Sequence, residues 1–379
     1  MINPNFFVSR LIEVGIEFAA GVPDSLLKHA CMAIHEKFDK KNHVITANEG
    51  SAVGLAIGYY LAKKSPALVY MQNSGLGNAI NPLTSLAHPE VYSIPMILMI
   101  GWRGEIEKDS NIQIKDEPQH SKQGKITLKL LDLLDIPYII LDKEEENLNE
   151  VLVEQRKLTE ERGGPVAIVV RKNTFLKYEA SDYEEEMSNF PREKAIKVII
   201  ENIKNDWPIV STTGMISREL FEIRKRSKQS DCHEFMLVGG MGHASQVASA
   251  IASERSDKKI ICIDGDGSIL MHAGSLAHCA EQDNIIHCVI NNGAHDSVGG
   301  QPTAARNLSL SDLAKSFGFK HVESVKNEEE LKETLNSSKN NEKSSFIEIY
   351  CKRGSRENLG RPDKTPVDNK NNFIRFLEN

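Results

Sequence analysis

The sequence lacks the features that direct a protein into a membrane or onto a nucleic acid. It contains no run of about 18 or more apolar residues, so no membrane-spanning helix is expected. Its start shows no basic segment followed by an apolar stretch, and we expect a cytoplasmic protein. The net charge of -7 offers no general attraction to nucleic acid or anionic lipid, although a local basic site is compatible with it. We therefore expect a small-molecule partner, no nucleic acid and no membrane.

Cysteine is also scarce. The six cysteines lie far apart and form neither a CxxC pair nor a group with histidines, a pattern typical of reduced core residues. The absence of CxxC clusters argues against an iron–sulfur centre. The six are Cys31, Cys232, Cys262, Cys279, Cys288 and Cys351.

What the sequence does have is a regular alternation of short apolar runs and helical stretches. A chain of 379 residues is long for one hydrophobic core, which favours two domains of similar size. The alternation predicts two doubly wound parallel sheets, an α/β fold, and the continuous apolar run 165–170 indicates burial on both faces of a sheet. The predicted strands are 17–20, 43–47, 67–72, 95–101, 138–142 and 165–170, then 208–211, 236–239, 259–264, 286–291, 319–322 and 345–351.

A polar segment separates the two series of strands. Residues 172–193 are rich in charge and lack a hydrophobic period, which is typical of a linker or of a solvated surface helix. We interpret the segment as a linker between a domain at 1–171 and a domain at 194–379.

Two motifs with metal-binding chemistry follow neighbouring strands of the second domain. Gly265-Asp266-Gly267-Ser268 comes after the run 259–264, and Asn291-Asn292-Gly293-Ala294 ends the next run. Either motif alone would be read as turn chemistry. Together they bring a carboxylate and a carboxamide to one edge of the sheet, where they suit a hard divalent cation that also holds phosphate oxygens. The pair predicts a Mg²⁺ and diphosphate site.

This pair of motifs resembles the signature of thiamine-diphosphate enzymes, in which Gly-Asp-Gly is followed further along by Asn-Asn. The resemblance implies thiamine diphosphate and Mg²⁺ as cofactors and the thiamine-diphosphate-binding fold in both domains. It also implies that Asp266, Asn292 and the backbone carbonyl of Ala294 bind the metal. The implied cofactor-binding residues of this segment are Gly265, Gly267, Ser268 and Asn292.

Two further turns of the second domain match the family. In Val238-Gly239-Gly240-Met241-Gly242, the resemblance implies that Gly239 accepts from the cofactor's amino group and that Met241 supports its two rings. Without the resemblance, this methionine would be a packing residue. Thr213 follows another strand and is a candidate for contact with the diphosphate or the pyrimidine, with a helix N-cap as the alternative.

The first domain contributes Glu49. It stands in Ala47-Asn48-Glu49-Gly50-Ser51-Ala52, which resembles the family segment whose glutamate hydrogen-bonds to the pyrimidine ring and promotes loss of the thiazolium proton. An isolated glutamate here would more often stabilise a helix start. The resemblance implies a pyrimidine-binding first domain and a diphosphate-binding second domain. It also implies a homodimer or dimer-based oligomer, with the cofactor between domains of different chains.

Within the family, the chain resembles the phosphonopyruvate decarboxylases over essentially its whole length. The resemblance rests on the absence of a middle domain and on three segments. The segments are 21–25 (GVPDS), 116–120 (DEPQH) and 291–303 (NNGAHDSVGGQPT). The implied reaction converts 3-phosphonopyruvate to 2-phosphonoacetaldehyde and CO₂ in phosphonate biosynthesis. Alternatives are sulfopyruvate decarboxylase, often divided into two subunits, a carboligase acting on another 2-oxo acid, and a catalytically silent subunit. Glu49 and the two metal motifs argue against the last.

Such a substrate needs proton donors and cationic groups. The candidate proton donors, each with an ordinary structural role as the alternative, are Asp24, His120 and His295. A phosphonate favours charge-assisted hydrogen bonds from arginine. The candidate substrate-binding residues are Ser25, Arg103, Arg356 and Arg361, and the alternative for each arginine is a solvated surface charge.

Overall fold

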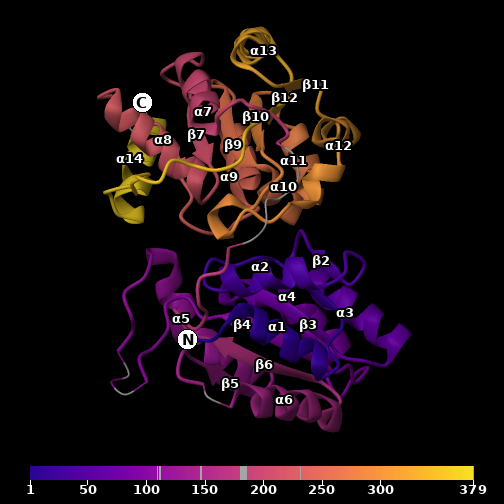
Figure 1. Cartoon of the computed structure of the whole chain (residues 1–379). Helices are drawn as coiled ribbons and strands as arrows, with labels where there is room; N and C mark the ends of the chain where they lie inside the picture. The colour runs from indigo at the N-terminus through magenta and orange to yellow at the C-terminus, as the bar shows by residue number, and fades with distance from the viewer. Residues whose placement is uncertain (109, 111, 146, 180–185, 231, 379) are drawn as a thin grey trace. The chain divides into compact units, whose positions relative to one another are not determined.

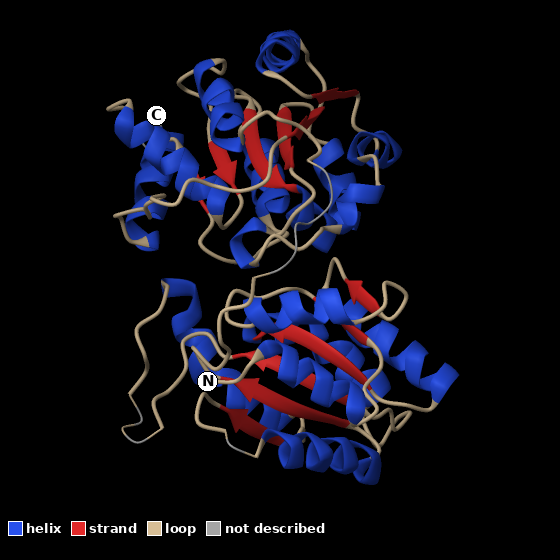
Figure 2. Cartoon of the chain, viewed as in Figure 1, coloured by secondary structure: helices blue, strands red, loops and turns tan. Residues whose placement is uncertain are grey.

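The computed structural model describes residues 1–379 except 109, 111, 146, 180–185, 231 and 379. The chain divides into two compact units, Met1–Tyr183 and Glu184–Asn379 (Figure 1). Each unit contains one sheet of six strands with helices around it (Figure 2). The α/β fold with two parallel sheets is therefore confirmed.

The sheet of the first unit has the strand order β2-β1-β3-β4-β6-β5, and all its pairs are parallel. Its strands are β1 Ala19–Gly21, β2 His43–Ile45, β3 Ala67–Gln72, β4 Met96–Gly101, β5 Tyr138–Leu141 and β6 Pro165–Val170. Its helices are α1 Pro4–Glu13, α2 Lys28–Lys37, α3 Glu49–Lys63, α4 Leu76–Pro82, α5 Pro118–Leu133 and α6 Leu148–Arg162, with short turns η1 Asn73–Gly75 and η2 Leu83–Ala87.

Successive side chains of β3 enter two different cores, as the two-residue period of a strand requires. Leu68 and Tyr70 belong to one buried cluster, whereas Val69 and Met71 belong to the other. Both faces of this central strand are therefore covered by helices. Every residue of β4 and β6 is also buried, which confirms that the continuous apolar runs lie in the middle of the sheet.

The sheet of the second unit has the order β11-β12-β10-β9-β7-β8. Its strands are β7 Ile209–Ser211, β8 Glu234–Met236, β9 Ile260–Gly265, β10 Ile285–Asn291, β11 His321–Val325 and β12 Ser345–Tyr350. Its helices are α7 Arg192–Glu201, α8 Met215–Arg226, α9 Ala244–Glu254, α10 Asp266–Met271, α11 Leu276–Ala280, α12 Leu310–Phe317, α13 Glu328–Asn340 and α14 Pro366–Glu378, with turns η3 Ala273–Ser275, η4 Asp296–Val298 and η5 Ala304–Asn307. Counted from the first strand of each unit, both sheets have the order second, first, third, fourth, sixth, fifth.

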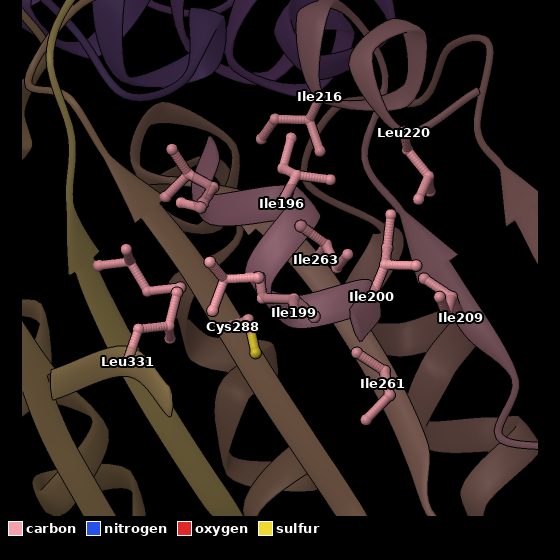
Figure 3. Packing of buried hydrophobic residues seen from close by; sticks show 14 of the residues in the cluster. Ile196, Ile199, Ile200, Ile209, Ile216, Leu220, Ile261, Ile263, Cys288 and Leu331 are labelled. Atoms are coloured by element: carbon pink, nitrogen blue, oxygen red, sulfur yellow. The ribbon is translucent and has the colours of Figure 1, made fainter. Parts of the chain in front are cut away.

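Figure 3 shows the core on one face of the second sheet. Ile196 and Ile199 of α7 lie against Ile261 and Ile263 of β9, with Cys288 of β10 beside them. The other face of the same strands belongs to a separate buried cluster that also includes residues of α9, α11 and α12. This second sheet is thus also covered on both faces, so that only the ends of its strands are available for binding.

A strand is found close to each of the twelve predicted ranges, with shifts at the ends. The largest, three residues at the C-terminal end, are at β8 and β11. Strand β8 ends at Met236 and not at 239, because the glycines that follow form a turn in which Gly240 has φ +66°. In the segment predicted as a linker, Phe175 is buried in the core of the first unit and Phe190 in that of the second. The domain limits stay a prediction, and 180–185 lie outside the described residues.

All six cysteines are free, and five of them are buried as expected, whereas Cys232 is partly exposed. Of the helices that the structure describes, none has the length and apolar character needed to cross a membrane.

Candidate active site

Three candidate residues of the first unit, together with Gly75, follow four neighbouring strands of its sheet. Asp24 follows β1, Glu49 follows β2, Gly75 follows β3 and Arg103 follows β4. Because these strands are parallel, the four segments leave the sheet at the same edge, where open α/β sheets bind ligands.

Glu49 is the first residue of α3 and is 5% exposed. The side chain of Asn48 caps the helix by accepting a hydrogen bond from Gly50 N at 2.8 Å. Asn78 Nδ2 donates to Glu49 Oε2 at 2.8 Å. Burial raises the pKa of Glu49, although the hydrogen bond from Asn78 lowers it. A buried carboxyl group with a raised pKa is suited to sharing a proton with a ring nitrogen.

The carboxyl group of Glu49 packs directly against Gly75. A Cβ atom on Gly75 would lie 2.5 Å from Glu49 Oε1, which is far inside van der Waals contact. The absence of a side chain at position 75 therefore provides the space that the carboxyl group occupies.

Arg103 is held by two side chains. Its Nε donates to Asp116 Oδ2 at 2.8 Å, its Nη2 to Asp116 Oδ1 at 2.5 Å, and its Nη1 to Ser25 Oγ at 2.7 Å. Asp116 is itself fixed, since it also accepts from the backbone N–H groups of Gly104 and Glu117. The guanidinium thus has a defined orientation beside the loop that follows β1.

Two further candidates interact electrostatically with Arg103. Asp24 is 1% exposed and accepts from Leu26 N and Leu27 N; burial raises its pKa to about 6, against the lowering effect of Arg103. His120, in the first turn of α5, is also buried, and burial together with Arg103 lowers its pKa to about 4. The structure therefore brings Asp24, Ser25, Arg103 and His120 into one group, while their roles stay predictions.

The candidate residues of the second unit follow the strands β7, β8, β9 and β10, which are also adjacent and parallel. Asp266 is the first residue of α10 and is 4% exposed. Thr303 Oγ1 donates to Asp266 Oδ2 at 2.5 Å. Burial raises the pKa of Asp266 to about 7, the Thr303 hydroxyl and Gly267 N–H lower it, and Asp296 raises it. None of these neighbours carries a positive charge, and a buried carboxylate in such surroundings fits a divalent cation.

The loop after β10 folds back over the Gly-Asp-Gly turn. Ala294 forms an antiparallel bridge with Pro302, and Thr303 N donates to Gly293 O at 3.0 Å. The ring of His295 packs against Gly267, where an added Cβ would lie 3.1 Å from the imidazole, and burial lowers the pKa of His295 to about 4. Asp266, Asn292, Ala294 and His295 are therefore gathered by one loop.

Ser268 joins the other two turns to this site. Its hydroxyl lies 2.9 Å from Thr212 Oγ1 and accepts from Gly242 N at 3.1 Å. The segments after β7, β8 and β9 are thereby tied together. Gly239 and Met241 are partly exposed, as a residue that meets a cofactor must be before the cofactor binds.

Two family models match this chain. The model described as thiamine pyrophosphate enzyme, N-terminal TPP binding domain, matches residues 4–129, and the corresponding C-terminal TPP binding domain model matches residues 212–349. The chain belongs to the thiamine pyrophosphate enzyme family. Thiamine pyrophosphate is the same compound as thiamine diphosphate, and each model matches part of one of the two units.

Three curated relatives of this thiamine pyrophosphate enzyme align over nearly its whole length. A phosphonopyruvate decarboxylase of Streptomyces hygroscopicus is 30% identical over 99% of this chain and 94% of the relative, and one of Streptomyces viridochromogenes is 29% identical over 100% and 95%. A sulfopyruvate decarboxylase of Methanosarcina acetivorans is 26% identical over 94% and 93%. The chain is a thiamine pyrophosphate-dependent decarboxylase, and hence a carboxy-lyase.

The two tail arginines of this thiamine pyrophosphate enzyme have different surroundings. Arg356 forms ion pairs with Glu193, at 3.2 Å, and with Glu222. A phosphonate would have to compete with two carboxylates for this guanidinium. Arg361 is exposed on the second unit.

Some contacts of the site involve residues that were not among the candidates named from the sequence. Thr212, and not its neighbour Thr213, reaches Ser268, and Thr303 reaches Asp266. Asn78 reaches Glu49, and Asp116 reaches Arg103. A signal was present for three of them, because Asp116 and Thr303 lie in the segments 116–120 and 291–303 that resemble the phosphonopyruvate decarboxylases, and Thr212 stands beside the candidate Thr213.

Proposed function

We propose that this decarboxylase converts 3-phosphonopyruvate to 2-phosphonoacetaldehyde and CO₂ in phosphonate biosynthesis. The orientation of Arg103 is the observation that carries the proposal. Among the described residues, its hydrogen bonds to Asp116 and Ser25 use three of the five N–H groups of the guanidinium, which leaves two for an anion. The full-length similarity to two phosphonopyruvate decarboxylases supports the same substrate.

The donor set of the second unit supports Mg²⁺ as the second cofactor. Asp266, Asn292 and the carbonyl of Ala294 would hold the ion, and this all-oxygen set suits a hard divalent cation. Residues predicted to hold thiamine diphosphate are Thr213, Gly239, Met241, Gly265, Gly267, Ser268 and Asn292, and we propose Thr212 with them because its hydroxyl contacts that of Ser268. When bound, thiamine diphosphate supplies the electron sink that stabilises the carbanion left by CO₂.

The residues of this chain would bind the substrate and move protons. Glu49 would exchange a proton with the pyrimidine ring, for which its burial and raised pKa are suited. Arg103 and Ser25 would hold the phosphonate. Asp24 and His120 lie near this guanidinium and have pKa values of about 6 and about 4, so that above pH 6 the carboxylate is ionised and the imidazole is neutral. His120 would then be an acceptor and Asp24 a proton carrier during product release.

We propose that the cofactor binds between the first unit of one chain and the second unit of another, as the resemblance to the thiamine-diphosphate enzymes implies. A homodimer or a dimer-based oligomer in the cytoplasm is therefore part of the proposal. Sedimentation velocity of the protein with and without Mg²⁺ and thiamine diphosphate would measure the assembly. A monomer with full activity would contradict it.

The substrate is tested by incubating the enzyme, Mg²⁺ and thiamine diphosphate with phosphonopyruvate, sulfopyruvate or pyruvate, and measuring aldehyde and CO₂. We expect the highest kcat/KM for phosphonopyruvate. Sulfopyruvate is the second candidate, because the sulfopyruvate decarboxylase relative also aligns over 94% of the chain and a sulfonate would find the same guanidinium. A higher kcat/KM for sulfopyruvate or pyruvate would refute the phosphonate assignment.

A further inference from the structure

A largely buried group of charged residues lies beside the proposed metal ligand Asn292. Asn292 Nδ2 donates to Asp296 Oδ2 at 2.7 Å. The same carboxylate oxygen accepts from Arg192 Nη1 at 2.6 Å and from Gly354 N at 3.0 Å. Three donors from three segments of the second unit therefore converge on one oxygen atom of Asp296.

Arg192 holds Asp296 in place and is itself held by other residues. It is the first residue of α7 and is 5% exposed. Its Nε and Nη2 donate to the two carboxylate oxygens of Glu219 in α8, at 2.8 Å and 2.9 Å, and its Nη2 also donates to Gly354 O at 3.2 Å. A paired, fork-shaped contact of this kind allows little rotation of the guanidinium. The position of Asp296 is thus set by two helices and the segment after β12.

The consequence for Asn292 is a choice between two orientations of its amide. A carboxylate can only accept hydrogen bonds, so Asp296 requires the NH₂ side of the amide. On the other side, Ala294 N donates to Asn292 Oδ1 at 3.2 Å, which requires the oxygen there. Both neighbours select the same orientation and keep the Asn292 oxygen on the side away from Asp296.

We infer that Asp296 is a positioning residue, which holds the amide oxygen of Asn292 in the orientation that binds the divalent cation, with Arg192 fixing Asp296 in turn. The inference rests on the proposed metal site of Asp266, Asn292 and Ala294. Partners that orient a metal ligand typically change metal affinity by about 10- to 100-fold when they are lost. Asp296 does not touch the substrate in this scheme and acts through Asn292.

The test uses Asp296→Ala and Asp296→Asn in the full-length protein. The readout is the Mg²⁺ concentration that half-saturates binding of radiolabelled thiamine diphosphate in equilibrium dialysis, which is independent of turnover. The alanine variant is expected to need about 10- to 100-fold more Mg²⁺. The asparagine variant is expected to bind near the wild-type concentration, since its amide oxygen can replace Oδ2. Asp296→Ser, whose side chain is too short to reach Asn292, serves if the alanine variant does not fold.

A matched control is Glu234→Gln, which disrupts the buried ion pair between Arg224 and Glu234, 2.8 Å in length, within the same unit. It is expected to lower the Tm and leave the Mg²⁺ requirement unchanged. If Asp296→Ala behaves like this control, the role of Asp296 is only structural and the inference is wrong. The inference is equally wrong if Asp296→Asn is as impaired as the alanine variant. Wild-type binding that needs no divalent cation would instead refute the proposed metal site itself.

Discussion

The carboxylate of Asp116 contacts the guanidinium of Arg103 with both of its oxygen atoms, at 2.8 Å and 2.5 Å. The same guanidinium reaches Ser25 in the loop after β1. Asp116 therefore decides which N–H groups of Arg103 are directed elsewhere. Asp116 belongs to the segment 116–120 but was not among the candidate site residues, and it controls the orientation of the proposed anion-binding group.

Asp116→Asn is expected to raise the KM for phosphonopyruvate by about tenfold or more, because a charge-assisted pair is worth about 1.5–3 kcal/mol and Arg103 would lose its orientation. The kcat should change little. Pyruvate, which has no phosphonate, should keep its KM. A matched control is Glu160→Gln, which removes the ion pair with Arg156 on α6. An equal rise in KM for phosphonopyruvate and pyruvate would mean that Arg103 does not bind the phosphonate group.

Glu49→Gln is expected to retain the fold and thiamine diphosphate binding but to lose most decarboxylation, because an amide cannot exchange the carboxyl proton. A loss of kcat of about 100-fold or more lies in the usual range for a proton-transfer group. Steady-state kinetics and equilibrium dialysis measure the two properties separately. Near-normal kcat would remove Glu49 from this role.

Gly75→Ala is expected to lower kcat with little loss of folding. Its new Cβ would lie 2.5 Å from Glu49 Oε1, and the flexible carboxyl group would move before the backbone does. Overpacking typically costs about 1–3 kcal/mol, which corresponds to a loss of about tenfold in kcat if the strain falls on Glu49. The matched control is Gly77→Ala, where an added Cβ meets nothing within 4 Å. Equal effects of the two substitutions would contradict the prediction.

The burial of Asp24 predicts a dependence of stability on pH. Its pKa is raised in the folded state from 3.8 to about 6, so the folded form binds the proton more tightly than the unfolded form. The resulting stability is fully present below the unfolded pKa and is lost as the pH rises through the folded pKa. Between about pH 4.5 and about pH 7.5, Asp24 should reduce the free energy of unfolding by about 2 kcal/mol. The measurement is urea unfolding of the wild type and of Asp24→Asn across this pH range. The difference between their free energies of unfolding should change by this amount. A difference that stays constant with pH would show that the pKa of Asp24 is not raised by burial.

Thr303→Val keeps the shape of the side chain but removes the hydroxyl that donates to Asp266. A hydrogen bond to a charged group contributes about 1.5–3 kcal/mol, so the Mg²⁺ requirement for thiamine diphosphate binding should rise by about tenfold or more. The control is Thr174→Val in the first unit, which removes a similarly buried hydroxyl that donates to Arg171 O at 2.8 Å. A Thr303→Val protein with the wild-type Mg²⁺ requirement would separate Thr303 from the metal site.

Those parts of the site that could be predicted are local in sequence. Asp266 and Asn292 each follow a buried strand directly, so the strand pattern alone places them at one edge of a parallel sheet. The position of Glu49 could be predicted for the same reason, since Glu49 is the first residue of α3, which follows β2. The twelve strands could be predicted because the hydrophobic period and the apolar composition of a segment are also local properties.

The remaining contacts depend on how long loops close. Arg192 and Asp296 are 104 residues apart, and Asn78 and Glu49 are 29 apart, so no local pattern indicates either pair. Thr303 reaches Asp266 only because the loop after β10 folds back on itself through the bridge between Ala294 and Pro302. Such contacts form only when distant segments pack together in the folded chain. Hydrophobic period, composition and motif spacing do not predict that packing.

Each of the two units has its own six-stranded sheet and its own cores, with Glu49 in the first and Asp266 in the second. Because one polypeptide carries both, every translated copy delivers one glutamate-bearing half and one metal-binding half. The numbers of the two halves are therefore equal at any level of expression, without coordinated regulation of two genes.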